Sequence, residues 1–278
     1  MPELPEVETT MRGIAPLIGL TVSQVNIRRP SLRWPIPRLL VDTLPNSRLS
    51  RLTRRAKYIL AEFNDANDIL IGTLILHLGM SGRICLLAQD ETAAKHDHFD
   101  ICFLGGQVLR LRDPRRFGAV LWVDANESVG AHPLMKTLGA EPLDKSFTAD
   151  YLYQQLRSRS VAIKTVIMDS HLVVGVGNIY ASESLFRAKI NPKTSANKVS
   201  FSKCESLVRE IKATLAASIE AGGSSLRDFF GADGNPGYFQ QTYFVYGRTD
   251  APCRECGAPI SRIKQGQRST FYCPCCQS

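Results

Sequence analysis

A helix near the N-terminus is predicted from apolar residues that recur at three- and four-residue steps. These residues are Leu4, Val7, Met11, Ile14 and Ile18. This spacing places apolar side chains on one face of a helix. Pro5 suits the first helical turn, and Glu6 and Glu8 suit the positive end of the helix dipole. Gly19 follows the last apolar position, so we expect the helix to stop there.

The pattern changes from about residue 21 to residue 124. Short runs rich in β-branched and apolar residues replace the helical spacing, at residues 69–71, 74–76 and 119–123. Turn-forming pairs, at residues 64–65 and 105–106, separate such runs. This alternation predicts an antiparallel β-sandwich or a β-barrel.

Helical spacing returns beyond about residue 148. Residues 151–156 and 161–167 predict two helices, and residues 179–186 predict a third. A capping-box pattern runs from Ser202 to Glu205, before apolar residues at four-residue steps up to Ile219. Gly222 and Gly223 are expected to end that helix, and a glycine-rich loop follows at residues 231–237.

The predicted fold class is therefore α+β. It combines an N-terminal β-sandwich domain preceded by a helix, a helical domain and a cysteine-rich C-terminal segment. We place the domain bounds at residues 1–135, 136–235 and 236–278.

Composition favours a globular protein with a basic surface. Hydrophobic residues make up 44% of the chain and the formal net charge is +8. This charge suits a polyanion such as nucleic acid, although a basic protein with no such partner has the same balance. No apolar run reaches the length of a membrane span, and the acidic, proline-bearing start is unlike a signal peptide. We therefore expect a cytoplasmic protein of bacterial type that does not bind membranes.

Two pairs of cysteines predict a metal site near the C-terminus. Each pair has two residues between its members, and the four residues are Cys253, Cys256, Cys273 and Cys276. In a reducing compartment this arrangement is typical of one tetrahedral, structural Zn²⁺. Cys275 is an alternative to Cys276 as the fourth ligand.

The zinc site would fix a hairpin over residues 259–271 that carries Arg262, Lys264 and Arg268. Basic side chains on a rigid hairpin suit contact with phosphate groups. The alternative is a solvated charged loop without a ligand.

The second residue offers a nucleophile. Once Met1 is removed, Pro2 carries a free secondary amine, and α-amino groups titrate near pH 8. Such an amine can attack an electrophilic carbon and form a Schiff base. Glu3 lies beside it as a candidate acid. The plain alternative is that Pro2 only begins the chain and Glu3 caps a helix.

Several motifs in order along the chain resemble the formamidopyrimidine-DNA glycosylase family. They are PELPEVE at residues 2–8, RRAKY at 54–58, HLGMSG at 77–82, DPRRFG at 113–118, GVGNIY at 175–180 and the terminal cysteines. The resemblance covers essentially the whole chain. It implies a β-sandwich, a helix–two-turns–helix element and a zinc finger.

The resemblance also implies an activity. Members of this family excise 8-oxoguanine and formamidopyrimidines from duplex DNA through a Schiff base, and then cleave the strand by β,δ-elimination. By resemblance, the catalytic residues are Pro2, Glu3, Lys57 and Arg268. We accordingly expect a monomer that binds double-stranded DNA containing oxidised bases and works in association with the nucleoid.

The resemblance assigns DNA contacts as well. The expected DNA-binding residues are His77, Met80, His98, Arg115, Arg116, Phe117, Lys164, Asn178 and Tyr238. Asn178 and Arg268 would clamp a phosphate, while Met80, Arg115 and Phe117 would fill the gap left by the extruded nucleotide. A base-recognition loop is expected over residues 222–238. Arg115 would read the base opposite the lesion and favour cytosine, which presents two acceptors to its donors.

Two other functions remain open at this point. An endonuclease VIII-like enzyme for oxidised pyrimidines shares the Pro2-Glu3 start, although residues 4–7 (LPEV) favour the purine enzyme. A zinc-finger DNA-binding protein without catalysis would have no need of a free proline nitrogen. The sequence does not establish the preference between 8-oxoguanine and formamidopyrimidines.

Overall fold

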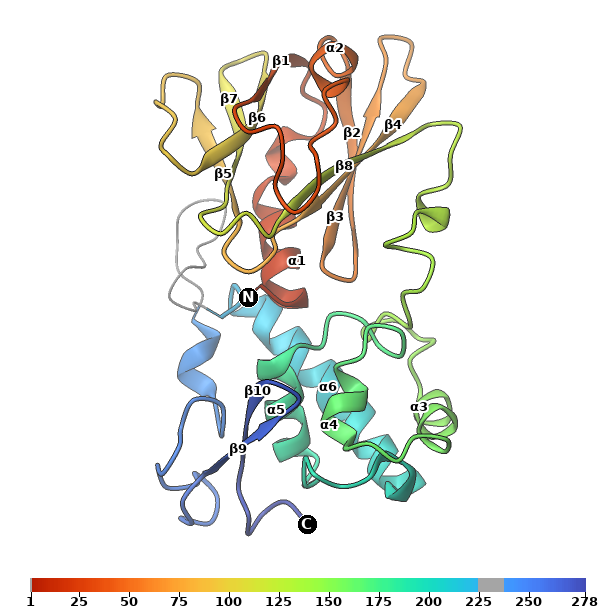
Figure 1. Ribbon diagram of the computed structural model, residues 1–278, viewed down its shortest axis with the longest axis vertical. Helices are drawn as coiled ribbons and strands as arrows, with labels where there is room; N and C mark the ends of the chain where they lie inside the picture. The colour runs from red at the N-terminus through yellow and green to blue at the C-terminus, as the bar shows by residue number, and fades with distance from the viewer. Residues whose placement is uncertain (1, 225–237) are drawn as a thin grey trace. The chain divides into compact units, whose positions relative to one another are not determined.

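The structure is a computed structural model that describes residues 2–224 and 238–278 (Figure 1). The chain forms two compact units. The first comprises Met1–Lys136 and Ala221–Tyr238, and the second comprises Thr137–Glu220 and Phe239–Ser278. The zinc-finger segment therefore belongs to the same compact unit as the helices.

The first unit contains two four-stranded antiparallel sheets. One has the strand order β1 (Val22–Ile27), β6 (Asp97–Phe103), β7 (Gln107–Arg112) and β5 (Arg83–Ala88). The other has the order β2 (Arg48–Arg55), β3 (Tyr58–Asn64), β4 (Leu70–His77) and β8 (Ala119–Asp124). Because the sheets are separate, the prediction of a sandwich is confirmed and a closed barrel is not formed. The apolar runs at 69–71 and 74–76 fall largely on one strand, β4.

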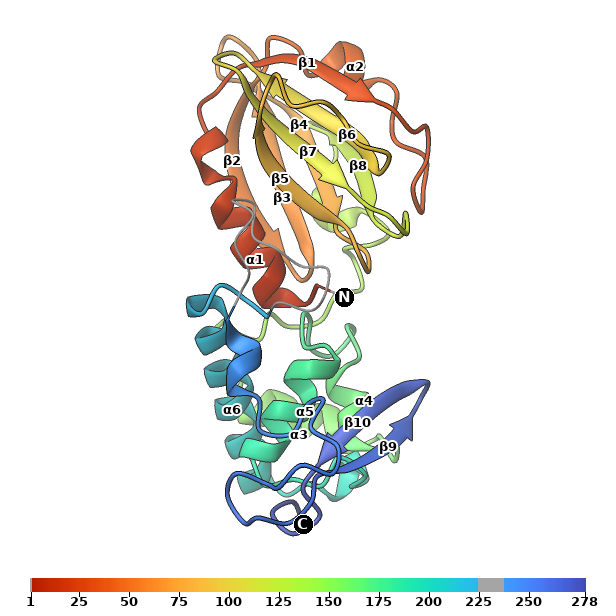
Figure 2. The same ribbon diagram turned by 90° about the vertical axis from the view of Figure 1, so that its left-hand side faces the viewer.

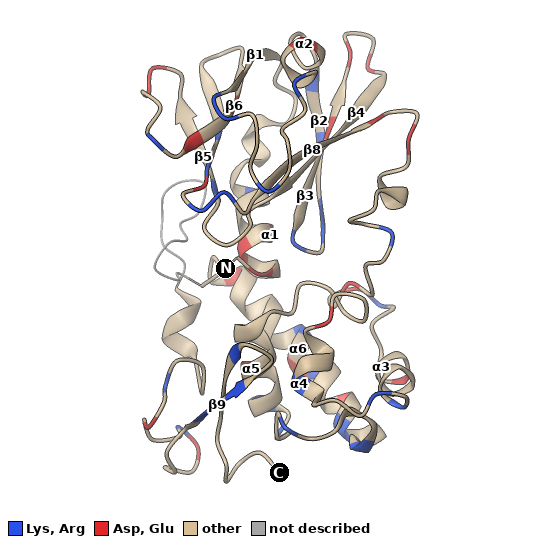
Figure 3. Ribbon diagram, in the orientation of Figure 1, with Lys and Arg blue, Asp and Glu red and all other residues tan. Residues whose placement is uncertain are grey.

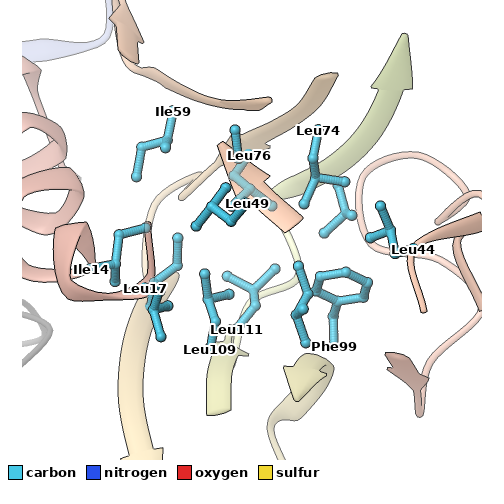
Figure 4. Close-up of a cluster of buried hydrophobic side chains, with 14 of the residues drawn as sticks. Ile14, Leu17, Leu44, Leu49, Ile59, Leu74, Leu76, Phe99, Leu109 and Leu111 are labelled. Carbon is cyan, nitrogen blue, oxygen red and sulfur yellow. The ribbon is translucent and has the colours of Figure 1, made fainter. Parts of the chain in front are cut away.

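The core of the first unit lies between these sheets. Strand β3 alternates half-buried and buried positions, so Ile59, Ala61 and Phe63 point inward. Leu74 from β4 meets Phe99 and Leu111 from the opposite sheet in one buried cluster (Figure 4). Burial of such side chains contributes about 1.5–3 kcal/mol each, and this interlayer cluster holds the two sheets together.

The N-terminal helix is shorter than predicted. Helix α1 spans Leu4–Gly13, and a 3-10 turn, η1, follows at Ala15–Leu17. Pro16 lies inside this turn and has no N–H to continue the α-helical ladder, which explains the early end. Ile14 is still fully buried, but Ile18 is 44% exposed, so its placement on the apolar face was wrong.

Helix α1 contacts β2 and β3 of one sheet and β5 of the other (Figure 2). A further short helix, α2, spans Leu40–Thr43 and was not predicted. A 3-10 turn, η2, follows the last sandwich strand at Val129–Ala131.

The second unit confirms the predicted helices. They are α3 (Ala149–Leu156), α4 (Ile163–Ile167), α5 (Asn178–Arg187) and α6 (Phe201–Glu220), with 3-10 turns η3 (Ala196–Lys198) and η4 (Phe239–Thr242). The predicted basic hairpin is also present, as strands β9 (Ser261–Gln265) and β10 (Arg268–Tyr272). No helix in residues 2–224 and 238–278 is long and apolar enough to span a membrane.

The predicted capping box of α6 is wrong by two residues. The helix begins at Phe201, and the hydroxyl of Ser200 accepts the Lys203 N–H at 3.3 Å. Ser202 already lies inside the first turn, so it cannot occupy the N-cap position. The predicted stop is confirmed, because α6 ends at Glu220 and Gly222 and Gly223 have positive φ angles of 75° and 81°.

Candidate functional site

The chain start is held by a buried carboxylate. Pro2 and Glu3 are both buried, and Glu3 occupies the N-cap of α1, where it forms a capping box with Glu6. One oxygen of Glu6 accepts the Glu3 N–H at 2.8 Å, and the other accepts the Ser224 N–H at 2.8 Å. Glu6 is 1% exposed. A single carboxylate therefore fixes the backbone next to Pro2 and the backbone at Ser224.

Ser224 and Tyr238 are paired with each other in the first unit. Ser224 and Tyr238 form an isolated antiparallel bridge, and the Tyr238 N–H donates to the Ala221 carbonyl at 3.1 Å. The expected base-recognition loop, residues 222–238, lies largely outside the described residues, because these exclude 225–237. The Tyr238 side chain is 60% exposed.

The turn between β2 and β3 places Lys57 next to the end of β4. Ala56 adopts a positive φ of 55°, and Arg54 donates to its carbonyl at 2.9 Å and to Glu8 at 2.9 Å. Arg54 thus secures the turn to α1, while Lys57 is half-buried. Figure 3 shows this turn as a basic segment of the first unit.

His77 is held in a neutral state. Its Nδ1 accepts the Gly79 N–H at 3.1 Å, and its ring lies 4.8 Å from the Tyr58 ring. Burial, and then the charges of Lys57 and Arg33, lower the pKa of His77 to about 4. Because Nδ1 is an acceptor, Nε2 carries the proton and can donate a hydrogen bond to an anion.

Two exposed loops of the first unit carry Met80, Arg115 and Phe117. We call these three the wedge residues, because they are expected to fill the gap left by the extruded nucleotide. Met80 is 39% exposed and Phe117 is 43% exposed. The Arg115 guanidinium stacks over the Phe117 ring at 5.0 Å from its centroid. Apolar side chains that stay exposed on loops are available for contact with a partner.

The two histidines of the KHDH segment, residues 95–98, have different environments. His98 is buried, and its Nε2 donates to the Asp113 carbonyl at 2.9 Å. His96 is half-buried and lines a pocket of about 490 Å³. The basic residues that share this pocket with His96 are Arg28, Arg29, Lys95 and Arg116. His98 and Arg116, which were both predicted from the sequence, line the same pocket, whereas sequence reasoning did not find His96, Arg28, Arg29 or Lys95.

Lys164 is buried in the second unit, with 2% of its surface exposed. Its ammonium donates to Asn178 Oδ1 at 2.6 Å, to Thr270 Oγ1 at 2.7 Å and to the Ser269 carbonyl at 3.3 Å. Asn178 also donates to the Ser269 carbonyl at 3.0 Å. This cluster joins α4 and α5 to β10, which begins at the exposed Arg268.

Asn178 is not the helix cap. Gly177 occupies the N-cap of α5, and Asn178 is its first helical residue. The glycine turn before it contains Gly175, whose φ of 78° favours glycine. The Asn178 side chain therefore bonds to Lys164 and to the hairpin and does not cap the helix, and its amide nitrogen has a second hydrogen.

The four predicted zinc ligands come together. The sulfur atoms of Cys253, Cys256, Cys273 and Cys276 all lie within 4.8 Å of one another. Tetrahedral zinc with Zn–S bonds of about 2.3 Å requires sulfur separations of about 3.8 Å. The observed 3.4 Å (Cys256 to Cys273) and 3.9 Å (Cys253 to Cys276) fit one ion. Cys275 is exposed and is not part of this cluster, which favours Cys276 as the fourth ligand.

Glu183 is a supporting residue that sequence reasoning missed. It is 1% exposed, and its carboxylate accepts the backbone N–H groups of residues 244–246 at 2.8–3.0 Å. It therefore fastens the start of the zinc-finger segment to α5. A carboxylate within an otherwise buried helix was the available signal, because buried charges need partners.

Comparison with known proteins gives matches along the chain. The family model of the formamidopyrimidine-DNA glycosylase N-terminal domain matches residues 1–120, and that of its H2TH domain matches residues 138–230. The model of the zinc finger found in FPG and IleRS matches residues 251–278.

Curated relatives are similar over nearly all of their length. A formamidopyrimidine-DNA glycosylase of Methylobacillus flagellatus is 62% identical over 277 residues, covering 100% of this chain and 96% of the relative. One from Janthinobacterium is 55% identical, with 100% of both chains covered.

Solved structures of such enzymes are also similar. Thermus thermophilus MutM (Fpg) has a TM-score of 0.86 and 34% identity, covering 99% of this chain and 98% of that one. A Lactococcus lactis FPG mutant in complex with DNA containing Fapy-dG has a TM-score of 0.91 and 33% identity, with 100% of both chains covered.

The zinc cluster generates a first prediction. Cys253→Ser is expected to abolish stoichiometric zinc binding, because three thiolates do not complete the structural site and metal binding is coupled to local folding. Cys275→Ser serves as the matched control and should retain about one zinc per chain, as measured by metal analysis of purified protein. Loss of zinc from the Cys275 variant together with its retention in a Cys276→Ser variant would reverse the ligand assignment.

A second prediction concerns pH. The unfolded chain binds a proton at His77 near pH 6.5, whereas the folded protein does so only near pH 4. Stability contributed by this residue therefore falls as pH drops from about 6.5 to about 4. We expect the thermal unfolding midpoint of His77→Gln to depend less on pH across this window than that of the wild type. NMR titration should find the His77 imidazole neutral at pH 6, and a midpoint of titration above pH 6 would contradict the burial argument.

Proposed function

The chain belongs to the formamidopyrimidine-DNA glycosylase family, and from this membership we propose that it is a bifunctional DNA glycosylase and AP lyase that excises oxidised purines from duplex DNA. The anchored N-terminus is the observation that carries the proposal. Glu6 holds Glu3 by its backbone, so the amine of Pro2, released when Met1 is removed, has a fixed place at the start of α1. We place this work in the cytoplasm, on the nucleoid.

The proposed reaction begins at Pro2. Its nitrogen lone pair attacks C1′ of the damaged nucleotide, the bond from C1′ to the base breaks, and the base leaves with the electron pair and takes up the proton that the Pro2 nitrogen releases. Glu3 delivers a proton to the sugar ring oxygen as the ring opens, which gives an iminium ion. Loss of a proton from C2′ expels the 3′ phosphate, and a second elimination expels the 5′ phosphate. The iminium nitrogen is the electron sink for both steps.

We propose that both positively charged and neutral hydrogen-bond donors contact the DNA phosphates. Lys57 offers a point charge at the β2–β3 turn, and His77 offers a neutral N–H that does not titrate near neutral pH. In the second unit, Arg268 and Asn178 contact a phosphate. Lys164 is proposed both to contact DNA and to position Asn178, because its buried ammonium donates to Asn178 Oδ1 at 2.6 Å.

The basic pocket beside His96 is a further part of the proposed interface. Its arginine and lysine side chains suit the DNA backbone, since phosphate contacts provide affinity without sequence selection. We assign backbone contact on this side to His96, His98 and Arg116, which all line the pocket, and His98 also holds the turn at Asp113. Tyr238 remains a proposed DNA contact at the end of the recognition segment.

The proposed enzyme acts as a monomer with one structural zinc. We keep the domain bounds 1–135, 136–235 and 236–278 as part of the proposal. Activity on oxidised pyrimidines is the disfavoured alternative, since the relatives are formamidopyrimidine-DNA glycosylases.

Borohydride trapping tests the chemistry. On a duplex that contains 8-oxoguanine opposite cytosine, borohydride should reduce the iminium ion to a stable protein–DNA adduct, and peptide mapping should place this adduct at Pro2. A duplex with an oxidised pyrimidine is the matched control and should give much less adduct. Mapping of the adduct to Lys57, or stronger trapping on the pyrimidine duplex, would overturn the assignment of nucleophile or of substrate.

Arg115 is expected to select cytosine opposite the lesion. The orphaned cytosine offers two acceptors to the guanidinium fork, whereas adenine presents a donor against it. A bidentate contact of this kind is worth roughly 1–3 kcal/mol, or about tenfold to a hundredfold in rate. Arg115→Ala should therefore lower the cytosine-to-adenine ratio of single-turnover excision rates by about this factor. Arg116→Ala is the control and should slow both reactions alike. An unchanged ratio in the Arg115 variant would limit Arg115 to filling the stack.

A further inference from the structure

The two loops that carry the wedge residues are joined to each other by a buried carboxylate. The Met80 loop closes on itself through the Gly82 N–H, which donates to the Leu78 carbonyl at 2.8 Å. The loop at residues 113–118 contains a turn in which the Arg116 N–H donates to the Asp113 carbonyl at 3.2 Å. Both tips are exposed, but the residues between the loops are not: Asp113 is 0% exposed and Ser81 is 8% exposed.

Each oxygen of Asp113 has a partner. The Ser81 hydroxyl donates to Oδ1 at 2.9 Å, and the Gly118 N–H donates to Oδ2 at 2.8 Å. The same Ser81 oxygen accepts the backbone N–H of Arg115 at 3.2 Å. One hydroxyl thus links the Met80 loop to the carboxylate and to the backbone of Arg115. Hydrogen bonds to a buried carboxylate are stronger than those between neutral groups, because the acceptor is charged and water does not compete for it.

The loop backbones also lie in direct contact. Gly79 has a φ of 62°, and a Cβ atom there would lie 2.3 Å from the Phe117 carbonyl carbon. A Cβ atom on Gly118 would lie 2.7 Å from the His77 carbonyl oxygen. No side chain fits between the two loops at these points, so a shift of one loop displaces the other.

We propose that Ser81 and Asp113 form a clamp that makes Met80 and the Arg115–Phe117 tip one preorganised wedge, and that Ser81 is a positioning residue for selection of the opposite base. This inference rests on the proposed function, because it concerns how the wedge enters DNA. A wedge that is ordered before binding loses less conformational freedom when it enters the stack. The clamp also fixes the position of Arg115 relative to Met80, and a bidentate contact with cytosine requires such a fixed position.

Ser81→Ala tests the clamp. This change removes the link from Asp113 to the Met80 loop and the acceptor of the Arg115 N–H. The ratio of single-turnover excision rates opposite cytosine and opposite adenine should then fall roughly three- to tenfold, which is the scale of one or two hydrogen bonds. Ser81→Thr keeps the hydroxyl and should restore the ratio. The matched control is Ser50→Ala, which removes a sandwich hydroxyl that also makes two hydrogen bonds, to Glu62 and Asn64, and should leave the ratio unchanged.

A second substrate separates this inference from the proposed function. A single-stranded abasic oligonucleotide has no opposite base, so borohydride trapping on it measures the Pro2 chemistry alone. Failure of the wild type to form an adduct on this oligonucleotide and on the 8-oxoguanine duplex would defeat the proposed function. Normal trapping by Ser81→Ala together with a reduced cytosine-to-adenine ratio on duplexes supports the clamp, and an unchanged ratio overturns it.

Amide exchange in the wild type provides a test that does not depend on folding of the variant. The clamp requires slow exchange of the Arg115 and Gly118 N–H groups, although the side chains of residues 114–117 are exposed. Fast exchange at both positions in the free protein would overturn the proposal even if Ser81→Ala could not be purified.

Discussion

The carboxylate of Glu6 is the interaction on which the chemistry of the first unit depends. A buried charge costs free energy unless its hydrogen bonds are complete. The Glu6 carboxylate accepts hydrogen bonds from two backbone N–H groups that are far apart in sequence, those of Glu3 and Ser224. Proline itself has no polar side chain with which to fix its amine. The position of Pro2 is therefore determined by its neighbour's backbone, and hence by Glu6.

The same principle recurs at the other parts of the proposed interface. Asp113 orders the loop that carries Arg115, Lys164 orients Asn178, and Glu183 fastens the zinc-finger segment. In each case a buried charged group holds an element whose neighbouring residues face solvent. Exposed functional groups are mobile unless a second layer restrains them. In this chain the restraining residues are buried charged groups. Because water does not reach them, water does not compete for the hydrogen bonds that hold the exposed elements in place.

Much of this organisation could be predicted from the sequence, and the limits have physical causes. Periodicity located the sandwich strands and the helices, and cysteine spacing identified the zinc ligands, because these signals are local. The end of α1 was missed because Pro16 converts the last turn, and the α6 cap was missed because Ser200 rather than Ser202 precedes the helix.

Contacts between distant segments left no local signal. His96 and His98 are two residues apart, but only His98 lies on a strand, because β6 begins at Asp97. The strand also has a register shift between Asp97 and Phe99. The different environments of the two histidines therefore depend on strand pairing, which the local sequence does not show. The buried state of Lys164 depends on Thr270, which lies 106 residues further along the chain. Resemblance to the family pointed to candidate segments, whereas the environment of each side chain required the three-dimensional structure.

In the proposed function, burial of the exposed apolar side chains at the loop tips offsets part of the free energy needed to extrude a nucleotide. Extrusion of a nucleotide costs a few kcal/mol. Met80 and Phe117 are each about two-fifths exposed in the free protein, and full burial of such a side chain contributes about 1.5–3 kcal/mol. Covering their remaining exposed surface within the base stack therefore returns roughly 1 kcal/mol each, a substantial part of that cost but not all of it. Since the wedge alone does not drive extrusion, the remaining free energy must come from the Arg115 contact with the orphaned cytosine, from the phosphate contacts and from contacts with the extruded nucleotide. Of these, only contacts with the extruded nucleotide distinguish the lesion from an intact base, so selectivity for the lesion depends on them.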